Sequence, residues 1–91
     1  MSRYSKNIIK EDKQYNIAWG YDYPLNSYFI QEFDEKDDIV FDVDSYRSIK
    51  CHPLFPDKYQ FSNGEILEVY KIYTDVIPEE HLEALVLDLP F

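Results

Sequence analysis

The alternation of large and small side chains between positions 15 and 21 restricts the fold of this chain more than any other feature. Four large apolar residues occupy every second position there: Tyr15, Ile17, Trp19 and Tyr21. Successive side chains of a β-strand point to opposite faces, so this period of two predicts a strand with one apolar face. Gly20 falls between two of these residues and predicts either a ring lying across the strand or a bulge.

Two further strands are predicted over residues 27–33 and 39–43. The first has apolar residues on both faces, Tyr28 and Ile30 on one and Phe29 and Phe33 on the other. This is typical of a central strand that is covered on both sides. The acidic stretch 34–38 predicts a turn. Because consecutive strands with short connections usually pair, we expect an antiparallel three-stranded meander over about 15–43.

Two helices are predicted after the strands, over about 63–75 and about 78–87. Ser62 and Glu65 form a capping-box pattern at the start of the first helix. Pro78 suits the first position of the second helix, where its missing N–H costs nothing. The second helix should turn one apolar face to the sheet through residues at helical spacing: Leu82, Leu85 and Val86.

The remaining segments have weaker patterns. Residues 1–13 lack periodicity and predict a mobile arm or a weak edge strand. Asp44 or Ser45 could cap a short helical turn that runs through Ile49, and the two prolines that follow exclude a longer helix. The predicted fold is therefore of the α+β class, with a meander packed by two C-terminal helices.

Length and aromatic content together indicate a single folded domain over residues 1–91. A chain of this length has no room for a second core. Aromatic residues make up 18% of it, and large rings bury much surface per residue, so even a short chain can close a core.

The features that distinguish cellular compartments favour the cytoplasm. Cys51 is the single cysteine, so no intramolecular disulfide can form, and small secreted domains usually need such bonds. The first thirteen residues are polar and lack the apolar core of a signal peptide. The longest uninterrupted apolar run, residues 84–87, is far too short to cross a bilayer, so no membrane contact is expected.

The charge is strongly negative and unevenly distributed. The formal net charge is −9, but residues 1–13 carry four basic and two acidic residues, so the rest of the chain carries −11. Such a surface repels nucleic acid and anionic membranes and attracts basic protein surfaces. Direct nucleic-acid binding is therefore not expected, although the acidity could also serve only solubility.

Seven acidic residues lie within thirteen positions of the chain and form the main candidate site: Glu32, Asp34, Glu35, Asp37, Asp38, Asp42 and Asp44. A calcium loop would need a glycine at the sharp turn and a distal glutamate, which this stretch lacks. A pair of catalytic carboxylates is conceivable, as any two acids at the right separation could serve. The cluster could also mimic the phosphates of a nucleic acid, or be a solvated turn whose charges protect a sheet edge.

No motif for catalysis, metal binding or cofactor binding accompanies these acids. Cys51 and His52 are adjacent, and neighbours rarely ligate one ion, while a structural zinc site would need further cysteines. His81 follows an acidic residue on the second predicted helix and is expected at the surface. We therefore expect a protein without catalytic residues, metal or cofactor.

Tyrosines form a second candidate contact group around the first turn. Tyr21 and Tyr23 lie close to Trp19, and any ring left exposed would provide the rigid amphipathic contact that is enriched at protein interfaces.

The run Gly20–Asp34 resembles the core of a group of small, uncharacterised bacterial proteins. Their shared pattern is a Gly-Tyr-Asp turn followed by an aromatic strand that ends in Phe-Asp. The segment Pro78–His81, with residues 83–84 and 87–90, is similar to the ending of those proteins. The resemblance covers about a third of the chain and implies no particular activity. In size, acidity and lack of catalytic motifs, the chain is also similar in type to anti-CRISPR and other phage-encoded inhibitors.

The leading functional hypothesis is a non-catalytic, acidic protein-binding module, of the kind carried by phages or mobile elements. It would cover the basic surface of a nucleic-acid enzyme with residues 32–44 and with exposed rings such as Tyr21 or Tyr23. Three acids of the helical part would assist this acidic face: Glu65, Glu68 and Glu79. A second hypothesis is a small housekeeping or immunity-type protein that dimerises or assembles through an apolar patch. A third is a small enzyme that uses paired carboxylates, which predicts a cleft with a strongly shifted acid.

Overall fold

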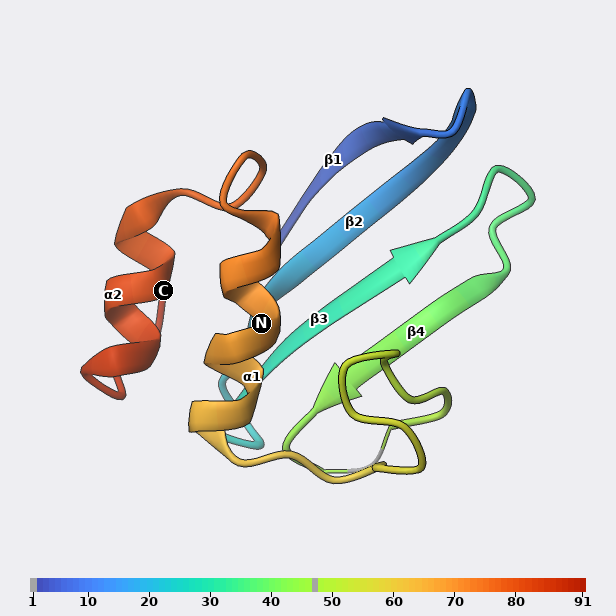
Figure 1. Cartoon of the computed structure of the whole chain (residues 1–91). Helices are drawn as coiled ribbons and strands as arrows, with labels where there is room; N and C mark the ends of the chain where they lie inside the picture. Colours follow the sequence, from blue (N-terminus) through green and yellow to red (C-terminus); the bar gives the residue numbers. More distant parts are fainter. Residues whose placement is uncertain (1, 47) are drawn as a thin grey trace.

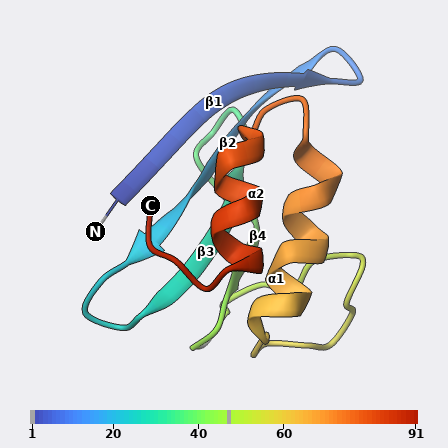
Figure 2. The ribbon, with the colours of Figure 1, turned by 90° about the vertical axis from the view of Figure 1, so that its left-hand side faces the viewer.

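The structure, a computed structural model, describes residues 2–46 and 48–91. Its elements, in chain order, are β1 (Ser2–Lys10), β2 (Lys13–Asp22), β3 (Ser27–Phe33), β4 (Ile39–Asp44), α1 (Asn63–Tyr70), the short 3₁₀ helix η1 (Lys71–Tyr73) and α2 (Glu79–Val86). The strands form one antiparallel sheet in the order β1-β2-β3-β4 (Figure 1). Both α-helices lie against the same face of the sheet, which confirms a two-layer α+β fold (Figure 2).

The sheet has four strands, so the prediction of a three-stranded meander was one strand short. Ser2–Lys10 forms the edge strand β1, which was one of the two predicted alternatives for the first thirteen residues. Glu11 and Asp12, both with positive φ, make the two-residue turn into β2. β1 has one neighbouring strand and is largely exposed, so it needs no alternation of apolar residues. For this reason the sequence of β1 shows no periodic pattern.

The three predicted strands are confirmed, and their register determines which side chains face the helices. Trp19 lies opposite Ile30, and Ile30 lies opposite Val43. All three are buried on the face that the helices cover. The pairing of β3 with β4 shifts between Glu32 and Phe33, which marks an irregularity just before the turn.

The first helix begins as predicted and ends slightly earlier. Both halves of the capping box form: the Glu65 amide donates to Ser62 Oγ, and the Ser62 amide donates to the Glu65 carboxylate. The α-helix ends at Tyr70 and tightens into η1, so helical structure ends at Tyr73 and not at 75. The buried Tyr70 hydroxyl donates to the carbonyl of Phe29 at 2.6 Å, which ties α1 to the middle of the sheet.

The second helix turns a slightly different face to the sheet than predicted. Pro78 is the residue before the helix, not its first residue. Leu85 is buried, but Val86 is 64% exposed, and the covered face instead includes Ala84 and part of His81.

The segment between β4 and α1 contains no helix among its described residues, so the predicted helical turn through Ile49 was wrong. Asp44 Oδ1 does accept the Tyr46 amide at 2.8 Å, as a helix cap would. The chain then runs along the outer side of β4, where the Asp42 amide donates to the Lys50 carbonyl at 2.9 Å. The segment therefore covers one edge of the sheet. No helix within residues 2–46 and 48–91 is long and apolar enough to cross a membrane.

Candidate functional site

Four of the candidate acids, Asp34, Glu35, Asp37 and Asp38, form a turn that we call the acidic turn. It projects beyond the helices at the far end of the sheet, next to the tip of the β1–β2 hairpin (Figure 1). Asp34 Oδ1 accepts the amides of Lys36 and Asp38, both at 2.9 Å. Two backbone bonds of 2.9 Å also close the loop, from Asp37 to Asp34 and from Asp34 to Asp38. These four bonds restrain the turn, while Glu35, Asp37 and Asp38 remain exposed.

The other three acids do not belong to this surface. Glu32 is 1% exposed and Asp42 is 4% exposed. Asp44 is half-buried, with its carboxylate engaged by the Tyr46 amide. Residues 32–44 therefore do not form a continuous acidic face, because Glu32 and Asp42 lie at strand positions whose side chains are buried.

Glu32 and Asp42 lie on opposite faces of the sheet. Glu32 is paired with Phe41 and shares its face, whereas Asp42 is paired with Gln31 on the other face. Burial raises the pKa of Asp42, and hydrogen bonds from Gln31 and Ile49 partly oppose that rise. Since the sheet separates the two carboxylates, they cannot act together on one bond as a catalytic acid and base.

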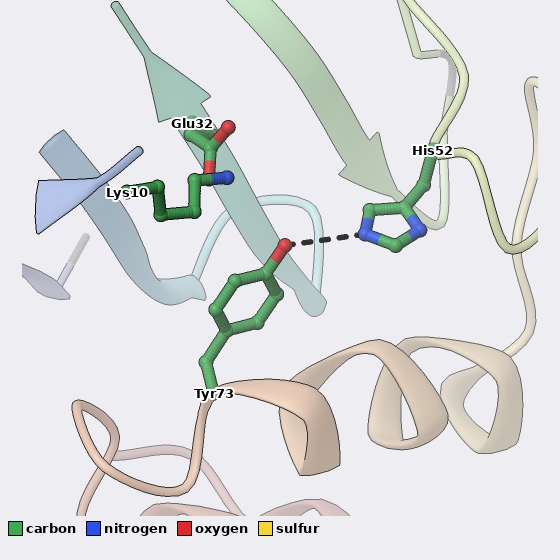
Figure 3. A network of polar contacts seen from close by, with 4 residues as sticks. All are labelled: Lys10, Glu32, His52 and Tyr73. Carbon is green, nitrogen blue, oxygen red and sulfur yellow. Dashed lines mark hydrogen bonds and ion pairs between the residues drawn. The ribbon is translucent and has the colours of Figure 1, made fainter. Parts of the chain in front are cut away.

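Glu32 belongs to a polar cluster at the margin of the core (Figure 3). Lys10 Nζ lies 2.8 Å from Glu32 Oε1, and the Lys10 side chain is 46% exposed. The Tyr73 hydroxyl lies 3.2 Å from Nε2 of His52, which is itself 6% exposed. Burial, reinforced by the charge of Glu32, raises the pKa of Tyr73, so its hydroxyl stays protonated.

The hydrogen bonds of His52 identify its tautomer. The Leu54 amide donates to Nδ1 at 3.0 Å, so Nδ1 carries no proton and the neutral ring holds its hydrogen on Nε2. Nε2–H therefore donates to the Tyr73 oxygen. Burial, together with the charge of Lys10, lowers the pKa of His52, in agreement with a neutral ring. Every hydrogen-bonding group of this imidazole is thus used within the fold.

The two candidate tyrosines lie far from the acidic turn. Tyr21 is 8% exposed and donates to Asn26 Oδ1 at 3.0 Å, so it is part of the core. Tyr23 is 49% exposed, but it follows β2, at the end of β3 opposite to the acidic turn. Seven residues of extended strand, about 23 Å at 3.3 Å each, separate the two groups.

A polar hollow flanks the acidic turn. It is lined by residues from the start of β2 and from the turn: Lys13, Gln14, Tyr15, Asp34, Glu35, Lys36 and Asp38. Its lining thus contains both lysines and carboxylates. Within the described chain no three His, Cys, Asp or Glu side chains converge as they would around a metal ion.

His81 lies in an aromatic cluster that the sequence did not predict, because this histidine was expected at the surface. Its Nδ1 accepts the indole N–H of Trp19 at 2.9 Å. The ring also stacks on Phe91, with centroids 4.3 Å apart, and packs against Tyr4 at 4.6 Å. The spacing within α2 held a partial signal, because His81 precedes the buried Leu85 by one helical turn and shares its face.

We predict that acidification below about pH 6.5 weakens the fold through both histidines. Burial lowers the pKa of His52 and of His81 below the ordinary value of 6.5. The folded protein then binds fewer protons than the unfolded chain, so their contribution is complete above pH 6.5 and is lost as pH falls towards the folded pKa values. Urea unfolding followed by fluorescence of Trp19, the single tryptophan, measures the effect.

The control for this prediction is the double variant His52→Gln, His81→Gln. Glutamine does not titrate, so the stability of this variant should change much less between about pH 7 and 5.5. An unchanged pH slope in the double variant would assign the effect to the carboxylates and contradict the role of the histidines.

Comparisons of the chain with protein-family models, with curated proteins and with solved structures found no match.

Proposed function

We propose that this protein is a non-catalytic binding module whose acidic turn docks onto a basic surface of a nucleic-acid-binding protein. In that mode it would act as an inhibitor that imitates the phosphates of the nucleic acid, as phage and mobile-element inhibitors do. The observation that carries the proposal is the conformation of the acidic turn. Three exposed carboxylates are presented on a loop that the Asp34 side chain already holds in place.

Preorganisation is what separates this turn from an ordinary solvated loop. A flexible loop loses conformational entropy when it binds, whereas a loop held by four internal hydrogen bonds loses less. The charges steer the approach of a basic partner and help to select it, which matters more for rate and specificity than for affinity. Glu32, Asp42 and Tyr21 are not part of the proposed contact, because they are buried.

The triple charge reversal Glu35→Lys, Asp37→Lys, Asp38→Lys tests the proposal. Asp34 is left unchanged, because its side chain holds the turn. We expect the wild type to retain a nucleic-acid-binding protein from a bacterial lysate at about 0.1 M salt and to release it at about 0.5 M, because screening shortens with ionic strength. The triple variant should retain none of it, and added duplex DNA should compete with the wild type.

A matched control distinguishes the acidic turn from net charge alone. The helical part of the chain, residues 63–91, holds seven acids against one lysine and is the larger acidic region. Reversing three of its exposed acids, Asp75, Glu80 and Glu83, changes the net charge equally but leaves the turn intact. Equal loss of binding in both triple variants, or no loss in either, would contradict docking through the turn.

One observation favours the second hypothesis, assembly through an apolar patch. Four large apolar side chains of the 45–60 segment are 46–70% exposed: Tyr46, Ile49, Leu54 and Tyr59. The Ser48 amide donates to the Tyr59 carbonyl at 2.7 Å, which brings the two ends of this patch together. An interaction through it would persist at about 0.5 M salt, because burial of apolar surface is not screened.

A further inference from the structure

The outer edge of β1 is a long, regular strand edge whose backbone groups have no partner among the described residues. β1 pairs with β2 without a break from Ser2, opposite Tyr21, to Lys10, opposite Lys13. In a hairpin closed by a two-residue turn, the flanking pair is hydrogen bonded, and alternate residues then point their backbone groups outward. These outward residues are Arg3, Ser5, Asn7 and Ile9. No backbone hydrogen bond from the described part of the chain outside the hairpin reaches them.

The opposite edge of the sheet, formed by β4, is covered by another segment of the chain. On β4 the outward groups belong to Asp42 and Asp44. The Asp42 amide donates to the Lys50 carbonyl, the Asp44 amide to Ser48 Oγ, and the Phe61 amide to the Asp44 carbonyl. The segment after β4 therefore covers that edge, whereas β1 carries neither a covering segment, nor a proline, nor a bulge.

We propose that the outer edge of β1 binds an extended acidic segment of another protein, which adds to the sheet as a fifth, antiparallel strand. Strand addition supplies main-chain hydrogen bonds, and side chains on the added strand supply selectivity. The ionisable side chains on β1 other than Tyr4 are cations, and Lys10 is already paired with Glu32. Arg3 and Lys6 are therefore the charges that a neighbouring strand would meet. Charges of opposite sign on neighbouring strands stabilise a pair, so these side chains select an acidic strand.

The same charges disfavour a second copy of this chain as the occupant. Pairing two β1 strands in antiparallel fashion over their full length places Lys6 opposite Lys6 of the other copy, since Lys6 is the middle residue of Ser2–Lys10. Like charges directly opposite each other destabilise a strand pair.

The test is binding of a labelled ten-residue peptide of alternating glutamate and threonine, measured by fluorescence anisotropy. The protein variant Ser5→Pro removes one outward N–H and places a ring on the edge, while an edge strand tolerates proline at such a position. We expect the wild type to bind the peptide and Ser5→Pro to bind it about tenfold or more weakly, since a lost hydrogen bond combines with a steric block. Ser5→Ala keeps the N–H and should bind like the wild type.

Three controls make the result decisive. Circular dichroism of Ser5→Pro must match the wild type, and if it does not, Asn7→Pro, at the next outward position, replaces it. A peptide of alternating lysine and threonine should not bind. The proposal is overturned if the acidic peptide fails to bind, or if Ser5→Pro binds it as well as the wild type does. It is also overturned if sedimentation shows a wild-type dimer that Ser5→Pro abolishes, because the edge would then be occupied by a second copy. This test does not involve the acidic turn, so its failure leaves the proposed function untouched.

Discussion

Replacing Gly20 with alanine should destabilise the fold by about 3 kcal/mol, the upper part of the range for forced overpacking. A Cβ atom at this position would lie 2.0 Å from the Ser2 carbonyl oxygen and 3.0 Å from the ring of Phe29. The first obstacle is backbone, so it cannot move away as the end of a side chain could. The φ angle of Gly20 is not positive, and the cost is therefore steric and not conformational.

Gly64→Ala is the matched control for this substitution. Gly64 lies in the first turn of α1, and its nearest atom, Ser62 Oγ, is 3.9 Å from a built Cβ. Alanine favours helix over glycine, so this variant should be equally or slightly more stable than the wild type. Chemical denaturation compares the two, and amide exchange reports whether β1 has detached. A Gly20→Ala protein of wild-type stability with protected β1 amides would contradict the pairing of Arg3 with Gly20.

Lys10→Met should cost about 2 kcal/mol, because it leaves the Glu32 carboxylate buried without its cation. The Lys10 ammonium is 2.8 Å from Glu32, whose side chain is 1% exposed, whereas that of Lys10 is 46% exposed. Water can partly replace the ammonium, so the loss should be smaller than for a fully buried pair. Methionine retains the apolar stem of the lysine, which limits the change to the charge.

The double variant Lys10→Met, Glu32→Gln isolates the charge interaction. A neutral amide costs less to bury than a lone carboxylate, so Lys10→Met should be nearly harmless in the Glu32→Gln background. The four unfolding free energies of this cycle give the coupling between the two residues. Additive effects of the two substitutions would mean that the ion pair contributes nothing and that Glu32 is satisfied by other groups.

Strand parity in the sequence also predicts which of the candidate acids are buried. Glu32 follows Ile30 by two positions and thus shares its face, and Asp42 lies between Phe41 and Val43, which face the core. Strand parity alone therefore separates Glu32 and Asp42 from the acidic turn. The identity of the Glu32 partner could not be read in this way, because Lys10 comes from a strand 22 residues earlier.

The sequence by itself determined the features that arise between near neighbours in the chain. The patterns of apolar residues indicated β2, β3 and β4, and the capping box of Ser62 and Glu65 indicated the start of α1. Tertiary structure decided the features that depend on what a segment meets in space. The exposed β1 needs no apolar pattern, because pairing with β2 holds it in place. Asp44 accepts the Tyr46 amide as a helix cap would, but no helix follows in the described residues, because the chain there bonds to the edge of β4. Likewise, His81 is partly buried because it accepts a hydrogen bond from Trp19, which is 62 residues away in the chain. Hydrogen bonding and ring stacking depend on distance in space and not on separation in sequence.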